Sequence, residues 1–236
     1  MIQHVGEKSL IDFEVGEMLL VNKPLQWTSF DVVGRLRGMF RIRKIGHAGT
    51  LDPRATGLLI VCTGKMTKSI DQFSALEKEY VGTMELGAVT ASFDAETEVV
   101  DRKDFSAVTT KQILDSFESF KGQQFQIGPM YSARKFQGKR LYKYARKGKT
   151  IERQPREIFI SKFDLLDVQL PFVKFRVVCS KGTYIRTLVN DCGAMLGCGA
   201  YLTQLTRTRI GEYDLDMAID VEQLHTLENK IHTRAH

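Results

Sequence analysis

A single strand pattern does most to limit how this chain can fold. Between residues 172 and 180 the odd positions from Val173 to Cys179 are apolar, and Lys174 and Arg176 lie between them. Side chains point alternately to the two faces of a strand. This strand therefore has one buried and one solvated face, and it belongs to a sheet that packs on a core.

Three further segments have the composition of short buried strands, at residues 17–22, 58–62 and 80–87. They are apolar and are bounded by polar or glycine positions. Helical patterns lie among them, but strand, helix and strand do not alternate regularly. We therefore expect an α+β fold instead of a doubly wound sheet. Neither an internal repeat nor a linker is visible, so we expect one domain over residues 1–236.

Four segments show helical patterns. Thr28 and Ser29 can cap a helix that runs to about Met39, and Thr183 can cap a helix over 183–196. A weaker pattern covers about residues 220–229. Residues 110–120 are expected to bury one stripe of side chains, formed by Ile113, Leu114, Phe117 and Phe120.

The composition is that of an ordinary globular chain, with 43% hydrophobic residues and no run of the roughly 20 apolar residues that a membrane helix needs. The first 17 residues lack the basic flank and apolar core of a secretory signal, so we expect a cytoplasmic protein. None of the four cysteines forms a CxxC pair, which argues against structural zinc. Cys62 and Cys179 lie in apolar runs and are expected to be buried, reduced thiols.

The positive charge is concentrated in two segments. Residues 35–44 contain five basic residues and no acidic one, and residues 134–156 contain ten basic residues and one acidic residue. The whole chain has a net charge of only +6, so the remainder is acidic. Tyr142 and Tyr144 lie within the longer segment, and cations beside flat rings are typical of nucleic-acid binding. The alternative is that both segments are simply solvated surfaces.

The segment GHAGTLDPRATG, residues 46–57, is the most unusual in the chain. Its glycines allow tight turns, and Pro53 keeps Asp52 extended just before a buried strand. Such a loop can present Asp52 to a substrate, or Asp52 can merely begin a turn. The spacing does not fit a phosphate-binding P-loop, because Met66 follows Lys65.

A second candidate segment is CSKGTYIRTLVND, residues 179–191. Gly182 ends the strand, and Tyr184 and Arg186 fall in the first turn of the helix that follows. A cation is disfavoured at the positive end of a helix dipole. Arg186 therefore needs a carboxylate or phosphate nearby, unless it is simply solvated.

These two segments, together with KEY at 78–80, resemble the TruB family of tRNA pseudouridine synthases. The resemblance extends to VNKPLQWTSFDVV at 21–33, PMYSARKFQGKRLYKYAR at 129–146 and LTRTRIG at 205–211, so it covers about residues 17–213 in order. It implies a mixed, mainly antiparallel sheet flanked by helices around a central catalytic cleft. It also implies conversion of uridine 55 in the T-loop of tRNA to pseudouridine without metal or other cofactor. We expect tRNA as the partner, no membrane, and a monomer.

The resemblance also implies roles for single residues. It matches Asp52 to the catalytic aspartate, Tyr80 to the tyrosine that stacks on the target base, and Arg186 to the arginine that pairs with that aspartate. His47 matches a histidine that holds the flipped-out bases, and Lys23 matches a Lys-Pro motif that lines the cleft.

Further residues are matched to RNA binding. Tyr184 and Leu205 match positions that pack around the target uracil. A basic insertion at about 120–156 is expected to grip the RNA, and its candidate contacts are Arg134, Lys135, Lys139, Arg140 and Arg146.

The chemistry is consistent with those roles. The reaction breaks the bond from N1 to the sugar and joins the sugar to C5, so the base must be flipped out. An ionised carboxylate can act as a nucleophile or stabilise a cationic sugar, and a neighbouring Arg186 would keep it ionised and oriented. Three roles are open for Asp52: attack on the sugar, attack on C6, or elimination of a sugar proton.

Two departures from the family pattern stand out. Gly128 precedes Pro129 where many relatives have a second proline, which would loosen that loop. Only about 25 residues follow LTRTRIG, too few for the C-terminal RNA-binding PUA domain of many bacterial relatives. The basic insertion would then carry more of the binding.

Two other classes of function remain open. One is an RNA-binding or RNA-folding protein in which chemistry is absent or secondary; the presence of Asp52, Tyr80 and Arg186 argues against it. The other is a glycoside or nucleoside hydrolase, which needs a second carboxylate as an acid, and none stands out.

Overall fold

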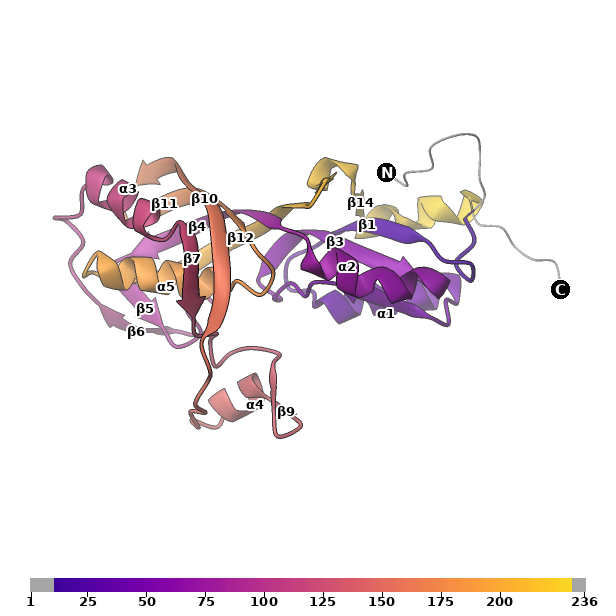
Figure 1. Cartoon of the computed structure of the whole chain (residues 1–236), viewed down its shortest axis with the longest axis horizontal. Helices are drawn as coiled ribbons and strands as arrows, with labels where there is room; N and C mark the ends of the chain where they lie inside the picture. The colour runs from indigo at the N-terminus through magenta and orange to yellow at the C-terminus, as the bar shows by residue number, and fades with distance from the viewer. Residues whose placement is uncertain (1–10, 231–236) are drawn as a thin grey trace. The chain divides into compact units, whose positions relative to one another are not determined.

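The computed structural model describes residues 11–230; residues 1–10, part of the segment in which we find no signal peptide, lie outside them. The chain divides into two compact units (Figure 1). The first unit contains described residues 11–80 and 206–230, and the second contains residues 81–205. Strands β4 (Lys78–Leu86) and β12 (Ala200–Ile210) run from one unit into the other.

The sheet of the first unit is centred on β3 (Ala55–Thr63). This strand pairs antiparallel with β1 (Met18–Lys23) and β2 (Ile45–Ala48), and β14 (Ile219–Asp220) pairs parallel with β1. Leu59 and Val61 pack in one hydrophobic cluster, and Leu58, Ile60 and Cys62 pack in another. Side chains that alternate along β3 thus enter different clusters. The sheet is covered on both faces, which is why residues 58–62 form a continuous apolar run.

Helix α1 (Ser29–Phe40) covers the cluster that contains Leu59. Thr28 and Asp31 form a capping box at its start, so the predicted cap is confirmed. The other cluster is covered by α2 (Ile70–Ala75) and by the short 3₁₀ segments η1 (Gly64–Ser69) and η2 (Leu215–Met217). Strand β13 (Tyr213–Asp214) pairs with the end of β12.

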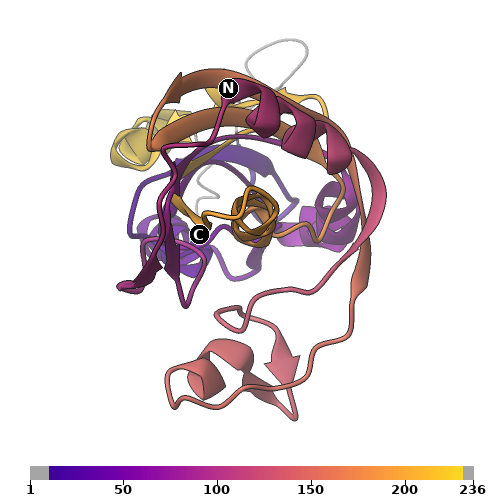
Figure 2. The same cartoon turned by 90° about the vertical axis from the view of Figure 1, so that its left-hand side faces the viewer.

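The second unit contains β10 (Arg156–Gln169), which pairs antiparallel with β11 (Phe172–Cys179) and β7 (Gly122–Gln126). Val173, Phe175 and Val177 are buried, so the alternating strand predicted between residues 172 and 180 is confirmed. Helix α3 (Thr110–Ser119) packs on β10 through Phe117, whose ring stacks on Phe163 at a centroid distance of 3.8 Å. Helix α5 (Ile185–Met195) lies against the start of β12 (Figure 2).

Two smaller hairpins complete this unit. Strands β5 (Ala88–Thr90) and β6 (Val99–Arg102) enclose a turn that belongs to the candidate site. Strands β8 (Lys135–Phe136) and β9 (Lys139–Arg140) precede the short helix α4 (Leu141–Ala145). Figure 2 shows that this insert leaves the sheet at the end of β7 and returns at the start of β10.

Three details of the predicted helices are wrong. Leu114 is 48% exposed, because the buried side of α3 contains Ser116 in its place. The N-cap of helix α5 is Tyr184, one residue later than expected, because the Thr183 hydroxyl donates to the carbonyl of Ser180 instead. Residues Val221–Lys230 form the 3₁₀ segment η3 and not an α-helix. None of the helices in the described part of the chain is long and apolar enough to span a membrane.

Candidate active site

Asp52 lies in the loop between β2 and β3, and the backbone on both sides of it is fixed by hydrogen bonds. The Leu51 amide donates to Ser29 Oγ at 2.9 Å, and the Ala55 amide donates to the Asp52 carbonyl at 3.0 Å. The Gln26 amide donates to the carbonyl of Pro53 at 2.8 Å. The predicted loop before a buried strand is confirmed, and it is attached to the start of α1 through Ser29.

Lys23 is fully buried in the same unit. Its ammonium donates to the carbonyls of Pro24 (2.9 Å) and Trp27 (2.6 Å). Burial lowers the pKa of Lys23 to about 8, and the carboxylate of Asp52 acts in the opposite direction. The Lys-Pro motif thus places a cation close enough to Asp52 for the two charges to interact.

His47 lies on β2, and the ring of Phe30 packs edge-on against it at a centroid distance of 5.3 Å. Burial, with a smaller contribution from the charge of Arg207, lowers the pKa of His47. The imidazole is therefore neutral near pH 7. Within the described residues its buried Nδ1 has no hydrogen-bond partner. A neutral flat ring of this kind can contact a base.

Tyr80 lies on the inward face of β4, two residues after Lys78. The Lys78 ammonium donates to the carbonyls of Ser74 and Leu76, each at 2.6 Å, and so fixes the end of α2 to the strand. The KEY segment therefore combines a structural lysine with the candidate stacking tyrosine. Tyr80 is the last residue of the first unit before the chain enters the second.

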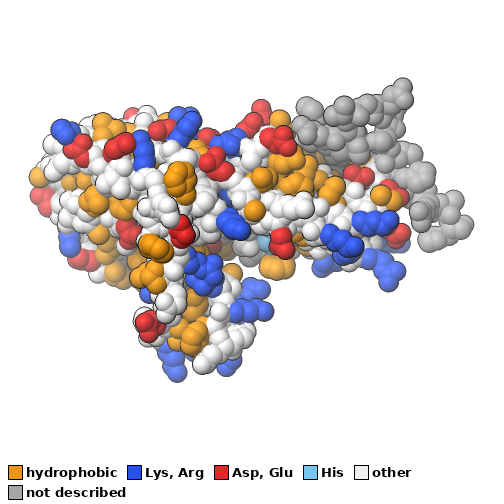
Figure 3. Space-filling model, viewed as in Figure 1, with side chains coloured by type: hydrophobic (Ala, Val, Ile, Leu, Met, Phe, Trp, Pro, Cys, Tyr) orange, Lys and Arg blue, Asp and Glu red, His pale blue; other side chains and the backbone are white. Residues whose placement is uncertain are grey.

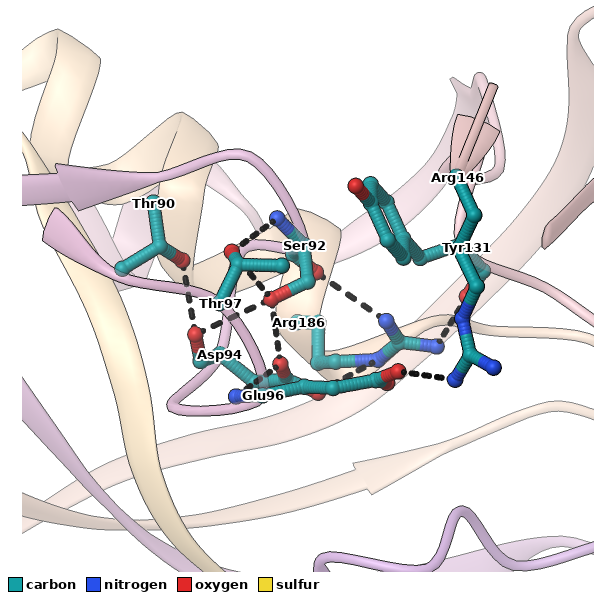
Figure 4. Close-up of polar contacts among 8 residues, drawn as sticks. All are labelled: Thr90, Ser92, Asp94, Glu96, Thr97, Tyr131, Arg146 and Arg186. Atoms are coloured by element: carbon teal, nitrogen blue, oxygen red, sulfur yellow. Dashed lines mark hydrogen bonds and ion pairs between the residues drawn. The ribbon is translucent and has the colours of Figure 1, made fainter. Parts of the chain in front are cut away.

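Arg186 lies in the second unit, in the first turn of α5, and is 3% exposed. Its Nε forms an ion pair with Asp94 Oδ2 at 3.4 Å, and its terminal nitrogens donate to the carbonyls of Ser92 (3.0 Å) and Tyr131 (2.9 Å) (Figure 4). The expectation that this arginine needs a carboxylate is confirmed. The pairing with Asp52 that the resemblance implies stays a prediction.

Asp94 was missed by sequence reasoning. Its Oδ1 accepts hydrogen bonds from Ser92 Oγ (2.6 Å) and the Glu96 amide (2.9 Å), and its carbonyl accepts one from Thr90 Oγ1 (2.7 Å) (Figure 4). Ser92 also contacts Thr97 Oγ1 at 3.0 Å. The cluster of Ser, Asp and Thr in TASFDAET is a turn signal, but nothing in it indicates a partner on a distant helix.

Tyr184 exchanges two hydrogen bonds with the buried amide side chain of Gln126: its backbone N–H donates to Oε1 at 2.8 Å, and its carbonyl accepts from Nε2 at 3.1 Å. Its ring lies over Gly128, where a Cβ would be 2.9 Å from Cε2. The departure at Gly128 therefore makes room for the tyrosine ring. Leu205, half-buried on β12, is the last residue of the second unit.

The insert between β7 and β10 exposes many cations (Figure 3). Lys135, Lys139 and Arg146 are exposed, and Arg134 and Arg140 are half-buried. Arg146 forms an ion pair with Glu96 at 3.0 Å (Figure 4). The insert also contains a hollow of about 380 Å³, lined by Arg134, Lys135, Phe136, Leu141, Ile151, Glu152, Arg153 and Gln154.

All four cysteines are free and buried, as expected for the two in apolar runs. Burial raises the pKa of Cys62 to about 11 and that of Cys192 to about 12, so both remain thiols at neutral pH. Among residues 11–230 no three His, Cys, Asp or Glu side chains are arranged to hold a metal ion.

Two sequence models match the chain. The N-terminal domain of the TruB family pseudouridylate synthases matches residues 37–185, and the tRNA pseudouridylate synthase B C-terminal domain matches residues 186–234. A protein from Parabacteroides distasonis named tRNA pseudouridine synthase B is 48% identical over 220 residues, which are 91% of this chain and 94% of the relative. A protein of the same name from Chloroherpeton thalassium is 47% identical over 89% of both chains.

Solved structures are also similar. A Cbf5-Nop10-Gar1 complex matches with a TM-score of 0.69 and 26% identity over 92% of this chain. An H/ACA RNP bound to a substrate RNA matches with a TM-score of 0.68 and 25% identity, also over 92% of this chain. In both cases this chain spans only 56% of the matched chain. The α+β fold with its mainly antiparallel sheet agrees with these structures, and the two sequence models show that the chain belongs to the TruB family of pseudouridylate synthases.

Proposed function

We propose that this chain converts uridine 55 in the T-loop of tRNA to pseudouridine, acting as a cytoplasmic monomer with Asp52 as the catalytic carboxylate. The relatives that cover almost the whole chain are named tRNA pseudouridine synthase B. The observation that carries the proposal is the loop at Asp52, whose backbone is fixed on both sides by Leu51, Pro53 and Ala55. A carboxylate held in this way can be presented repeatedly in one position to a bound nucleotide.

In the proposed reaction the bond between uracil N1 and ribose C1′ breaks, the base turns, and C5 bonds to C1′. The proton on C5 is lost and N1 gains a proton, so the composition of the RNA is unchanged. The target base is flipped out and stacks on Tyr80, because a base within a stacked loop is inaccessible. Asp52 acts on the nucleotide, and its charge interacts with that of the nearby Lys23.

Arg186, in the second unit, is the second charged residue that we assign to the reaction. The guanidinium is held by Asp94 and by two carbonyls, so its orientation is set before RNA binds. That Arg186 pairs with the catalytic aspartate, as the resemblance implies, is part of the proposal, because a planar guanidinium orients a carboxylate in a way that lysine cannot. Tyr184 and Leu205 pack around the uracil, and His47 holds the neighbouring flipped bases.

The test is tritium release from a T-loop hairpin labelled at C5 of uridine 55. Asp52→Asn should bind the hairpin as tightly as the parent protein, with turnover reduced roughly a thousandfold or more. Asp71→Asn, at an exposed position on α2, is the matched control and should be fully active. Full turnover by Asp52→Asn would remove Asp52 from its role, and release of free uracil would indicate a hydrolase.

We also propose that the basic insert binds the phosphate backbone of the RNA. Replacing both Lys139 and Arg140 with glutamate should weaken binding at low salt and flatten the dependence of log Kd on log salt, by roughly 0.7 to 0.9 for each lost phosphate contact. Lys111→Glu, on the exposed side of α3, is the control. An unchanged dependence of log Kd on log salt would mean that other residues make the phosphate contacts.

A further inference from the structure

Arg207 is the largest side chain that is fully buried in the described part of the chain. It lies on the part of β12 that belongs to the first unit. Its Nε donates to the carbonyl of Leu58 at 2.7 Å, and one terminal nitrogen donates to the carbonyl of Gly49 at 3.0 Å. Gly49 precedes Asp52 in the loop, and Leu58 follows it on β3. One guanidinium therefore joins the two ends of the segment that carries Asp52.

Both ends of the segment have a glycine that lies close to Arg207. Gly57 has a φ of +102°, and a Cβ there would be 2.3 Å from the carbonyl oxygen of Arg207. Gly49 has a φ of +75°, and a Cβ there would be 3.4 Å from Nη1 of Arg207. Both residues thus allow the loop to close around the strand. A contact between Thr56 Oγ1 and Thr206 Oγ1, at 2.9 Å, ties the same segments together.

A buried guanidinium is costly to desolvate, and packing alone does not require one. An apolar side chain of similar size would fill the space but would leave the carbonyls of Gly49 and Leu58 without these donors. Neither hydrogen-bond acceptor of Arg207 is a carboxylate; both are backbone carbonyls of the loop segment. What arginine adds is a rigid planar fork that fixes two acceptors relative to one another. That property fixes the geometry of the loop, which filling the space with an apolar side chain would not do.

We propose that Arg207 is a positioning residue for the reaction: its guanidinium holds the carbonyls of Gly49 and Leu58 at a fixed separation and thereby sets the place of Asp52, without touching the substrate. This inference rests on the proposed role of Asp52. Ser29 supports the loop from the helix side through Leu51, and Arg207 supports it from the strand side.

The test compares Arg207→Met and Arg207→Lys with Arg209→Met. Arg209 lies two residues further along the same strand, where it donates to the Gly211 carbonyl and pairs with Glu77 at the surface. A displacement of about 1 Å at a reacting group can cost roughly a hundredfold in rate, so Arg207→Met should lower kcat by about that factor, with KM for the hairpin nearly unchanged. Arg207→Lys, which keeps the charge but not the fork, should lose roughly tenfold.

Hydrogen exchange supplies a readout that a general loss of stability would not produce. The amides of Leu51 and Ala55 should exchange faster in Arg207→Met than in Arg209→Met, at a temperature well below both melting points, while amides of α1 are unaffected. A folded Arg207→Met or Arg207→Lys with the parent kcat would overturn the proposal, and so would loop exchange equal to that of the control. If Arg207→Met does not fold, Arg207→Lys decides alone.

Asp52→Asn is measured beside these variants, so that two failures can be told apart. If Asp52→Asn keeps its turnover, the proposed function fails. If Asp52→Asn is inactive and the folded Arg207 variants are fully active, only the positioning role fails.

Discussion

The ion pair between Asp94 and Arg186 should be worth far more than a shorter pair on the same unit. The N···O distance is 3.4 Å in this pair, and each side chain is only 4% exposed. Arg176 and Asp164 approach to 3.0 Å, but their side chains are 44% and 34% exposed. Solvent screens the second pair and not the first, so burial and not distance decides the difference.

Asp94→Asn removes the charge and keeps an oxygen that can still accept from Ser92 Oγ and the Glu96 amide. Breaking a buried pair from one side costs about 3 to 5 kcal/mol, whereas an exposed pair contributes about 0 to 1 kcal/mol. At about 2 to 4 °C per kcal/mol for a chain of this size, Asp94→Asn should lower the melting temperature by roughly 6 to 20 °C. Asp164→Asn should lower it by no more than about 4 °C.

The assay is thermal and urea unfolding followed by circular dichroism, together with a double-mutant cycle that pairs Asp94→Asn with Arg186→Met. The coupling energy for this pair should clearly exceed that of the matched cycle at Asp164 and Arg176. Equal melting shifts for Asp94→Asn and Asp164→Asn would refute the reasoning, because they would mean that burial adds nothing to the pair.

Three further predictions concern stability. Lys23 has a pKa of about 8 in the folded chain and near its ordinary value of 10.5 when unfolded. The unfolded chain therefore binds more protons between pH 8 and 10.5, and the free energy of unfolding should rise across that range by on the order of 3 kcal/mol. Urea unfolding measures this rise, which Lys23→Met should lack. Phe117→Ala should cost about 3 to 5 kcal/mol, while Phe125→Ala, at a 73% exposed position, should cost almost nothing. Gly34→Ala should stabilise α1 by about 1 kcal/mol, because nothing lies within 4 Å of the new Cβ. Gly193→Ala in α5 should destabilise, because its Cβ would be 2.1 Å from the nitrogen of Ala200. A gain at both glycines would contradict the packing described for α5.

Local sequence patterns were enough to predict the elements that depend only on residues close together in the chain. The alternation from Val173 to Cys179 and the cap at Thr28 both depend on neighbours within a few residues, and both are confirmed. Leu114 was assigned to the wrong side of α3 because the buried stripe includes a serine, which a hydrophobic pattern does not count.

The candidate site was predictable only in part, because its contacts join distant segments. The sequence indicates that Arg186 needs an anion, because a cation near the N-terminus of a helix is disfavoured by the helix dipole whatever the tertiary structure. That the anion includes Asp94 depends on how the turn between β5 and β6 packs against α5, and no local spacing encodes this. Arg207 was missed for the same reason: the residues it holds, Gly49 and Leu58, are remote in sequence.

The first unit is assembled from both ends of the described chain, and this has a consequence for synthesis on the ribosome. Asp52 and its loop emerge early, but Arg207 is added only after the whole second unit has been translated. At about 5 to 20 residues per second, the intervening stretch takes roughly 8 to 30 seconds. During that interval the nascent protein can fold its second unit, while the loop that contains Asp52 lacks its hydrogen bonds to Arg207.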